Sequence, residues 1–334
     1  MGVKSKSANM RAILLINTGS PKSLETKEVR NYLTDFLTDP RIIGLPQPLR
    51  SLLVHGIIAP TRSMTSKSRY AKVWRPEGSP LQILTEALAT RIESESGIAT
   101  FVAMRYNRGS LEEAYQRITT QGFTEVVLVP LFPHYAMSSY ESAVAHAVEV
   151  RQQGSYPFAL HCVAPYFSHQ LYIEALLEQI ERLATPDGHL LFSYHGIPLY
   201  QNKAYAGIPQ KDYPYQCGET TRLVTTHPRF KAMNLSYEIC YQSRFGHNRW
   251  LTPTLESRLE ALAKEGQKKV SVICPSFVCD CLETSWEVGI YMKERFSILQ
   301  PTLIGCPNDS LTMANCIIDQ VNHHTTEAIE WTKP

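Results

Sequence analysis

One histidine in the second half of the chain stands where a side chain could accept a proton or ligate a metal. His195 follows the apolar run 189–192 in the sequence FSYHGIP, and the glycine and proline directly after it favour a tight turn. Such a turn would hold the imidazole at a fixed place, and a neutral imidazole can accept a proton or bind iron near neutral pH. A histidine in a turn can equally be structural, so the chemical interpretation depends on a partner.

A row of acidic residues offers that partner. Asp280, Glu283 and Glu287 follow the apolar run 269–274 with spacings of three and four residues. If a helix begins here, the three carboxylates lie on one face. Such a row is either a solvated first turn at the positive end of the helix dipole or a set of oxygen ligands that passes a cation or a proton into a cleft. Both interpretations stay open from these residues alone.

Short apolar runs that end in turn residues alternate with stretches of helical periodicity along the chain. The expected strands are 11–17, 100–104, 125–129, 158–163, 189–192, 235–241, 269–274 and 302–304. The expected helices include 25–37, 170–183, 255–265 and 311–324. The alternation predicts an α/β fold with parallel sheets flanked by helices, in two Rossmann-like domains. We expect these at 1–165 and 166–334, with an active-site cleft between them and the last helix packing back on the first half.

Ligands of such folds lie beyond the carboxyl ends of the strands. Polar and aromatic residues that directly follow the expected strands should therefore converge on one cleft between the halves. These residues are Thr18, Arg105, His134, His195, Gln242 and Phe277.

Composition and motifs exclude several other classes of protein. The 334 residues are 43% hydrophobic and 19% charged, which indicates a folded chain, and a net charge of +2 gives no reason to expect nucleic acid as a partner. The first expected strand is not followed by G-x-G-x-x-G, and the chain has no G-x-x-x-x-G-K-[ST], so a nucleotide site is disfavoured. A serine hydrolase is disfavoured because no G-x-S-x-G motif occurs.

Eight cysteines are spread along the chain without the paired C-x-x-C spacing of zinc sites. They form no cluster near the C-terminus, so an iron–sulfur cluster is not expected. We expect reduced thiols in a cytoplasmic protein. The first ten residues lack the apolar run of a signal peptide, and no stretch approaches the ~20 apolar residues of a membrane span. The apolar segment 49–58 fits either the core or a lip that touches a membrane at its periphery.

Several stretches, in their order and combination, resemble the ferrochelatase family of bacterial type. The stretches are 17–21 (NTGSP), 36–41 (FLTDPR), 104–106 (MRY), 130–135 (PLFPHY), 193–198 (SYHGIP), 241–246 (YQSRFG) and 280–284 (DCLET). The likeness runs from about Ile13 to about Asn315. It implies a lyase of haem biosynthesis that inserts Fe(II) into a porphyrin, expected to be protoporphyrin IX, with release of two protons.

The resemblance also implies roles for individual residues. His195 and Glu283 would be the catalytic and metal-binding pair that faces across the macrocycle, with Asp280 and Glu287 as a delivery path for the metal. The porphyrin would be contacted by Thr18, Ser79, Arg105, Tyr106 and Phe277.

Some positions depart from the family's usual pattern. Thr18 stands where a bulky residue is common, His134 where glutamine is common, and Tyr291 where some members have a third acidic residue. Cys279 and Cys281 flank the acidic row, either as inert thiols or as soft ligands that tune metal choice. The alternatives are another tetrapyrrole metal chelatase or a non-catalytic porphyrin- or haem-binding protein. The sequence does not indicate the oligomeric state.

Overall fold

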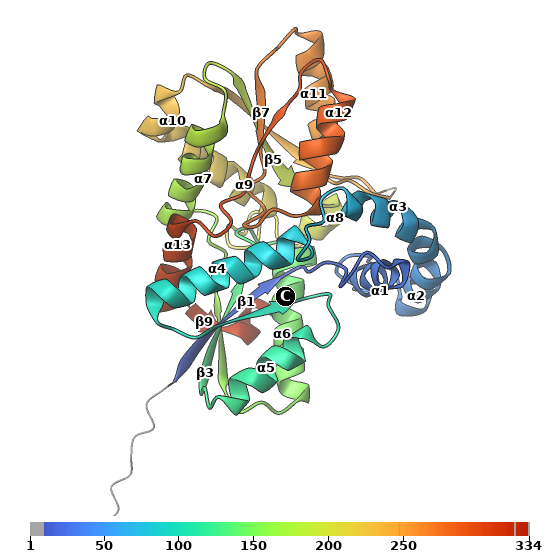
Figure 1. Cartoon of the computed structure of the whole chain (residues 1–334), viewed down its shortest axis with the longest axis vertical. Coiled ribbons are helices and arrows are strands. Elements are labelled where there is room, and N and C mark those ends of the chain that lie inside the picture. Colours follow the sequence, from blue (N-terminus) through green and yellow to red (C-terminus); the bar gives the residue numbers. More distant parts are fainter. Residues whose placement is uncertain (1–9, 247, 324, 333–334) are drawn as a thin grey trace, which may run out of the picture.

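Two α/β halves are stacked end to end in the computed structural model, which describes residues 10–246, 248–323 and 325–332 (Figure 1). The first sheet has the strand order β2-β1-β3-β4-β9, and the second has the order β6-β5-β7-β8. All neighbouring strands are parallel except β9, which runs antiparallel to β4. The predicted α/β class with two parallel sheets flanked by helices is confirmed.

The strands form where the chain has runs of β-branched and other apolar residues, because both faces of each sheet are covered. In the first half they are β1 (Arg11–Asn17), β2 (Thr100–Met104), β3 (Glu125–Pro130) and β4 (Ala159–Val163), joined by β9 (Thr325–Glu327). In the second half they are β5 (His189–His195), β6 (Ser236–Gln242), β7 (Val270–Ile273) and β8 (Thr302–Ile304). Strand β5 runs three residues beyond the expected 189–192, so His195 is the last residue of the strand itself.

The helices cover both faces of each sheet and join the two halves. The first half has α4 (Pro80–Ser96), α5 (Ser110–Thr120) and α6 (Ser142–Gln153). The second has α7 (Gln170–Leu183), α8 (Leu199–Asn202), α9 (Tyr213–Thr226), α10 (Pro228–Ala232), α11 (Leu255–Lys264), α12 (Lys293–Arg295) and α13 (Leu311–His323). One hydrophobic core runs through both halves, because it contains α4, α7 and α13 together with one face of each sheet. Residue 324, the expected end of the last helix, lies outside the described residues.

A separate lobe, here called the lip (residues 26–79), stands to one side of the first half (Figure 1). It contains α1 (Thr26–Leu37), α2 (Gln47–Leu53), the π-helix η1 (Val54–Ile58) and α3 (Ala59–Ala71). The lip ends at Ser79, the residue before Pro80, which fits the first turn of α4 because its missing N–H would have no partner there.

Three segments are π-helical, which the sequence did not predict. They are η1, η2 (Met137–Glu141) and η3 (Leu282–Met292), and a 3-10 helix, η4 (Ala328–Thr332), follows β9. Segments η2 and η3 both follow strand-end loops that open on the cleft. Such wide turns are uncommon and occur often at functional sites.

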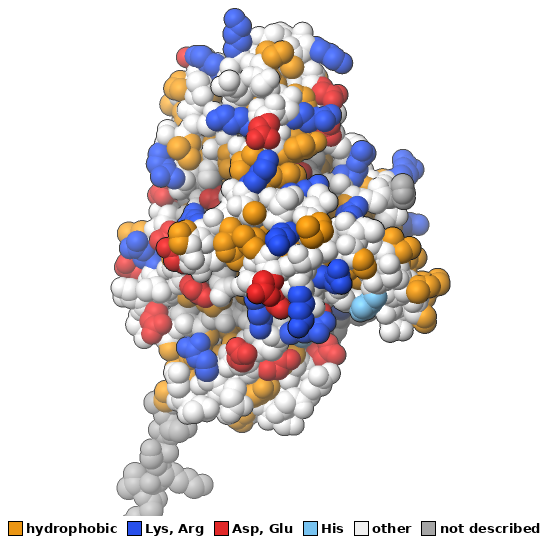
Figure 2. All heavy atoms as spheres, turned by 45° about the vertical axis from the view of Figure 1, so that its right-hand side comes forward, with side chains coloured by type: hydrophobic (Ala, Val, Ile, Leu, Met, Phe, Trp, Pro, Cys, Tyr) orange, Lys and Arg blue, Asp and Glu red, His pale blue; other side chains and the backbone are white. Residues whose placement is uncertain are grey.

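The outer surface of the lip carries exposed hydrophobic side chains. Figure 2 shows hydrophobic groups gathered on the protruding lobe, and the large ones exposed there are Leu45, Leu49, Leu52, Ile57 and Met64. Within the described part of the chain, no helix combines the length and apolarity needed to cross a membrane.

Candidate active site

A cavity that is partly open to solvent lies where the lip and the two halves meet. Its wall is mostly apolar, and it is lined by lip aromatics, by loops that follow β1 and β3, and by loops that follow β5 and β7. Four of the six residues expected to converge on a cleft line this cavity: Thr18, His134, His195 and Phe277. An apolar wall with a few polar groups is typical of a site for a large organic ligand.

His195 is held rigidly at the end of β5. Its Nδ1 lies 2.7 Å from the carbonyl oxygen of Gly196, so Nδ1–H donates there and Nε2 is left as the proton acceptor. The His195 carbonyl accepts a hydrogen bond from the hydroxyl of Tyr213 at 2.8 Å. A Cβ on Gly196 would lie 2.8 Å from the Gln242 carbonyl oxygen, which explains why glycine follows the histidine.

The electrostatics keep this imidazole neutral. Burial lowers the pKa of His195, and the nearby Glu283 carboxylate opposes that shift only in part. Glu283 lies in the first turn of η3 and lines the cavity. The same carboxylate also contributes, after burial, to the raised pKa of Tyr32 in the lip. Glu283 is therefore close enough to act on both His195 and the lip, and all three line the same cavity.

Gln242 supports this pair from behind rather than lining the cavity. Its Nε2 donates to the Glu283 carbonyl at 2.8 Å, and its Oε1 accepts from the Ser193 hydroxyl at 2.7 Å. The start of η3 is thereby bonded to the end of β6. Gln242 was expected in the cleft, but it is buried behind η3 and does not line the cavity.

Glu287 lies one turn of η3 beyond Glu283, outside the cavity lining. Its carboxylate accepts from the backbone N–H of Ser243 at 2.9 Å and from the Ser243 hydroxyl at 2.6 Å. Burial raises the pKa of Glu287 to about 7, although both Ser243 hydrogen bonds oppose that shift. At neutral pH this group can therefore either hold or release a proton.

Asp280 differs from the expectation of one acidic helical face. It precedes η3, and its carboxylate accepts from the Thr284 hydroxyl at 2.9 Å and from the Asn308 side-chain amide at 2.8 Å. Asp280 thus anchors the start of the helix and does not line the cavity. The sequence suggested a regular helix through residue 280, but the chain is still extended at Cys281, where the N-cap has φ −141° and ψ −170°.

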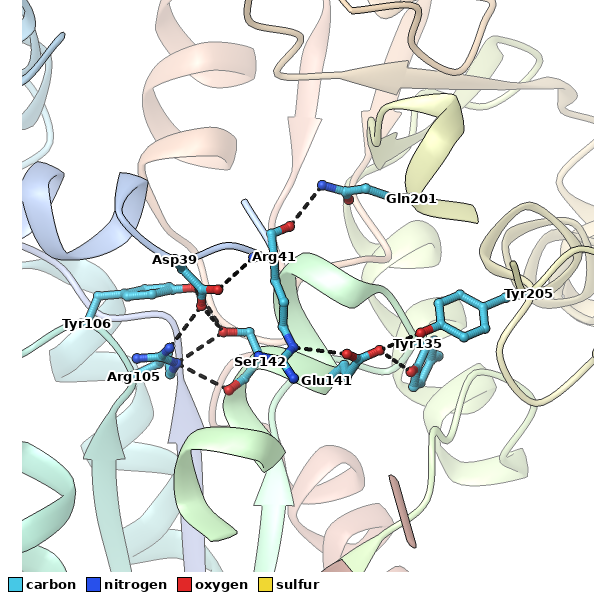
Figure 3. Close-up of polar contacts among 9 residues, drawn as sticks. All are labelled: Asp39, Arg41, Arg105, Tyr106, Tyr135, Glu141, Ser142, Gln201 and Tyr205. Atoms are coloured by element: carbon cyan, nitrogen blue, oxygen red, sulfur yellow. Dashed lines mark hydrogen bonds and ion pairs between the residues drawn. The ribbon is translucent and has the colours of Figure 1, made fainter. Parts of the chain in front are cut away.

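The residues expected to contact a porphyrin fall into two groups. Thr18, Ser79 and Phe277 line the cavity, and the Phe277 ring centre lies 6.0 Å from that of His195. Arg105 and Tyr106 do not line it. Both bond the buried carboxylate of Asp39, at 2.8 Å and 3.0 Å, as Figure 3 shows.

Asp39 binds these groups firmly. Burial alone would raise its pKa, but the Ser142 hydroxyl and the Arg105 guanidinium hold the pKa below its usual range. This pairing could not be predicted from the sequence because Asp39 and Arg105 are 66 residues apart. Arg105 was expected to contact the porphyrin directly, but its guanidinium is already bonded to the Asp39 carboxylate.

His134 lines the cavity and has one ring nitrogen without a hydrogen bond among the described residues. Its Nε2 lies 2.9 Å from the Thr220 hydroxyl, which itself donates to the Phe167 carbonyl, so His134 must be the donor. Its buried Nδ1 has no hydrogen-bond partner among the described residues. Burial lowers the pKa of His134 to about 3, so the ring stays neutral.

Several groups of metal-ligand type line the cavity: His134, His195, Cys281 and Glu283. Over the described ranges, no set of three or more histidine, cysteine or acidic side chains is arranged to hold a metal ion. Burial raises the pKa of the Cys279 and Cys281 thiols, which keeps both protonated in the absence of a metal. Tyr32 and Tyr70 also line the cavity, and no sequence signal separates them from ordinary core aromatics.

Comparison with known proteins gives a consistent result. The family model described as ferrochelatase matches residues 10–325. The ferrochelatase of Opitutus terrae is 36% identical over 329 residues, covering 93% of each chain. The ferrochelatase of Pseudomonas putida (strain W619) is 35% identical over 328 residues, covering 92% of this chain and 94% of the relative.

Solved structures support the fold alone. SirB from Bacillus subtilis with Fe3+ has a TM-score of 0.54 at 11% identity and covers 93% of this chain and 94% of its own. The sirohydrochlorin chelatase SirB from Bacillus subtilis subspecies spizizenii, in complex with cobalt, has a TM-score of 0.52 at 10% identity, with the same coverage. These likenesses agree with two parallel sheets on either side of a cleft.

Proposed function

The chain belongs to the ferrochelatase family, and from that premise we propose how its residues insert iron into a porphyrin. It is a lyase of haem biosynthesis with iron as a substrate. We propose Fe(II) and protoporphyrin IX as the pair of substrates, which would give protohaem. The mostly apolar wall of the cavity, with its aromatic side chains, supports a flat hydrophobic macrocycle as the ligand.

His195 is the proposed acceptor of the pyrrole protons. Metallation requires two protons to leave the macrocycle, so the site needs a neutral base with a free lone pair. The hydrogen bond from Nδ1 to the Gly196 carbonyl leaves Nε2 in that role, and burial keeps the ring neutral. This geometry is the single observation that carries the proposal.

Glu283 is the proposed first contact for the metal. A carboxylate binds a hard cation such as Fe(II) well, and Glu283 lies beside His195 at the cavity wall. Glu287, with a pKa of about 7, can take a proton onward from this pair or hold the field negative for an incoming cation. Asp280 supports both by fixing the start of η3.

The macrocycle would pack against apolar residues of the wall. A flat free-base ring presents its nitrogens poorly to a metal, so contacts remote from the metal must offset the strain of bending it. Phe277 and Trp250 line the cavity and suit ring packing, while Thr18 and Ser79 offer hydroxyl groups. Arg105 and Tyr106 would act indirectly, because they hold Asp39 at the base of the lip and do not line the cavity.

An anaerobic spectroscopic assay tests the proposal. The purified chain is mixed with ferrous iron and protoporphyrin IX, and the Soret band is followed. Turnover beyond one equivalent supports the proposal, while stoichiometric binding without turnover supports a non-catalytic porphyrin-binding protein. The same assay with coproporphyrin separates the two porphyrins, because faster turnover of coproporphyrin would contradict our choice of substrate.

We also propose that this protein works in the cytoplasm with its lip against a membrane surface. Residues 40–76 contain no aspartate or glutamate, and their exposed basic residues are Arg62, Arg69, Lys72 and Arg75. Exposed leucines with basic neighbours favour the surface of an anionic bilayer. The fraction of protein that sediments with anionic vesicles should be lower for Leu52→Ser than for the unaltered chain. Equal binding of the variant would count against the proposal.

Two further expectations complete the proposal. We propose that the chain carries no iron–sulfur cluster, because its eight cysteines are buried and free and, within the described residues, no three histidine, cysteine or acidic side chains are arranged to hold a metal ion. Acid-labile sulfide in the purified protein would refute this. We also propose the division at 1–165 and 166–334 as two domains that share the cleft.

A further inference from the structure

Glu141 joins three segments that are far apart in the sequence. One carboxylate oxygen, Oε1, accepts from Arg41 Nε at 2.9 Å, and Arg41 belongs to the lip. The other, Oε2, accepts from the Tyr135 hydroxyl at 2.5 Å in the first half and from the Tyr205 hydroxyl at 2.8 Å in the second half. Figure 3 shows all three partners converging on this one side chain.

Other contacts bring the second half to the same point. Gln201 Nε2 donates to the Arg41 carbonyl at 3.0 Å, so the lip is bonded to α8 as well as to Glu141. The ammonium of Lys211 lies 5.4 Å from the centre of the Tyr205 ring. We refer to Arg41, Glu141, Tyr135, Tyr205 and Gln201 as the tie.

The tie lies directly behind the cavity wall. Gln201 itself lines the cavity, and so do Ile42, next to Arg41, and Ser139, two residues before Glu141. The π-helical turn η2 ends at Glu141 and carries both Ser139 and the carboxylate. A shift of the tie would therefore move three separate parts of the wall together.

The Glu141 carboxylate needs its hydrogen-bond partners because it is buried. Glu141 is only 9% exposed, so the loss of any one partner would leave a buried carboxylate with fewer hydrogen bonds, which costs stability. The neighbouring Asp39 cluster differs, because its side-chain partners Arg105, Tyr106 and Ser142 all belong to the first half. Among these two buried carboxylates, only Glu141 joins the lip to the second half.

We propose that Glu141 is a positioning residue that fixes the base of the lip against α8, and thereby sets how tightly the macrocycle is held. It does not touch the reacting atoms. The inference rests on the proposed function, because it assumes that the cavity takes a porphyrin. Its effect should appear in binding and release rather than in the metallation step.

Kinetics of matched variants test this. Glu141→Gln should raise the KM for porphyrin and its dissociation rate constant by about tenfold and change kcat by less than about threefold, because a charge-assisted bond is lost away from the chemistry. Tyr205→Phe, which removes one hydroxyl, should show the same pattern at about threefold. Porphyrin fluorescence in a stopped-flow instrument gives the dissociation rate without iron.

Glu125→Gln is the control. Glu125 also pairs with an arginine, Arg11, at 2.8 Å, and its side chain is 11% exposed, as is that of Glu141. It lies at the start of β3, at the opposite end of the strand from the cavity. We expect the KM and the porphyrin dissociation rate of Glu125→Gln to stay within about twofold of those of the unaltered chain, even if the melting temperature of the variant is lower.

Two results would overturn the inference. One is a folded Glu141→Gln variant whose KM and dissociation rate are unchanged, and the other is an equal shift in Glu125→Gln. If Glu141→Gln does not fold, Tyr205→Phe decides on the same criteria. Failure of the unaltered chain to metallate would contradict the proposed function instead, and the iron-free dissociation rates would still test the tie.

Discussion

Two clusters of buried polar groups lie at the carboxyl ends of the two sheets, and they differ in what their atoms are bonded to. In the first half, Asp39, Arg105 and Tyr106 satisfy one another. In the second half, only Nδ1 of the His195 ring is hydrogen-bonded, to the Gly196 carbonyl, and Glu283 lines the cavity. Because a group that is already bonded has little left to offer a ligand, we infer that the first cluster holds the wall and the second acts on the substrate.

Removal of the imidazole should have the largest effect. We expect His195→Ala to lower kcat for metallation about a thousandfold, within the range that a positioned general base contributes. Porphyrin binding, measured by fluorescence, and the melting temperature should change little. Activity near that of the unaltered chain at saturating iron would remove His195 from the proposed role.

The carboxylate partner should come next. We expect Glu283→Gln to lower kcat/KM for iron about a hundredfold, because the amide keeps the shape but loses the charge that attracts the cation. Steady-state rates over a range of iron concentrations measure this. Equal losses with iron in large excess and with iron limiting would instead indicate a role in proton transfer.

The first cluster should respond in stability rather than in rate. We expect Asp39→Asn to lower the free energy of unfolding by about 2–3 kcal/mol, because the partly buried Arg105 loses its counter-charge. Denaturant unfolding measures this, and activity per folded molecule should be largely kept. Asp35→Asn is the control, since its partner Arg108 has a side chain that is 70% exposed, and the expected cost is at most about 1 kcal/mol.

His134 gives the smallest effect and sharpens the comparison, because it lies in the first half yet keeps an unused acceptor. Its folded pKa of about 3 is below the ordinary value of 6.5, so the unfolded chain takes up a proton that the folded chain refuses. Stability is therefore lost as the pH falls below 6.5. His134→Gln should reduce the loss between pH 7 and pH 5 by about 1–2 kcal/mol in denaturant unfolding. An unchanged pH dependence would show that His134 is protonated in the folded state.

The sequence predicts the strands well because each one is an apolar run that ends at a turn. It also predicts which side chains follow the strands, since the carboxyl ends of parallel strands share one edge. It does not predict that Arg105 faces Asp39 or that the helix near residue 280 begins late, because both depend on partners 66 and 28 residues away. The π-helical turns are equally hidden, as they arise from packing and not from a periodicity in the residues.

The antiparallel strand β9 has a consequence for how the protein is made. It pairs with β4, and Trp331 beyond it packs against Tyr135 and Tyr140, so the first sheet is completed by a segment that follows the whole second half. On a ribosome, β4 would emerge on the order of ten seconds before β9, at roughly 5–20 residues per second. For that time β4 is an open edge that can pair with a neighbouring nascent chain. The sheet of the first half is therefore completed only after the second half has been translated.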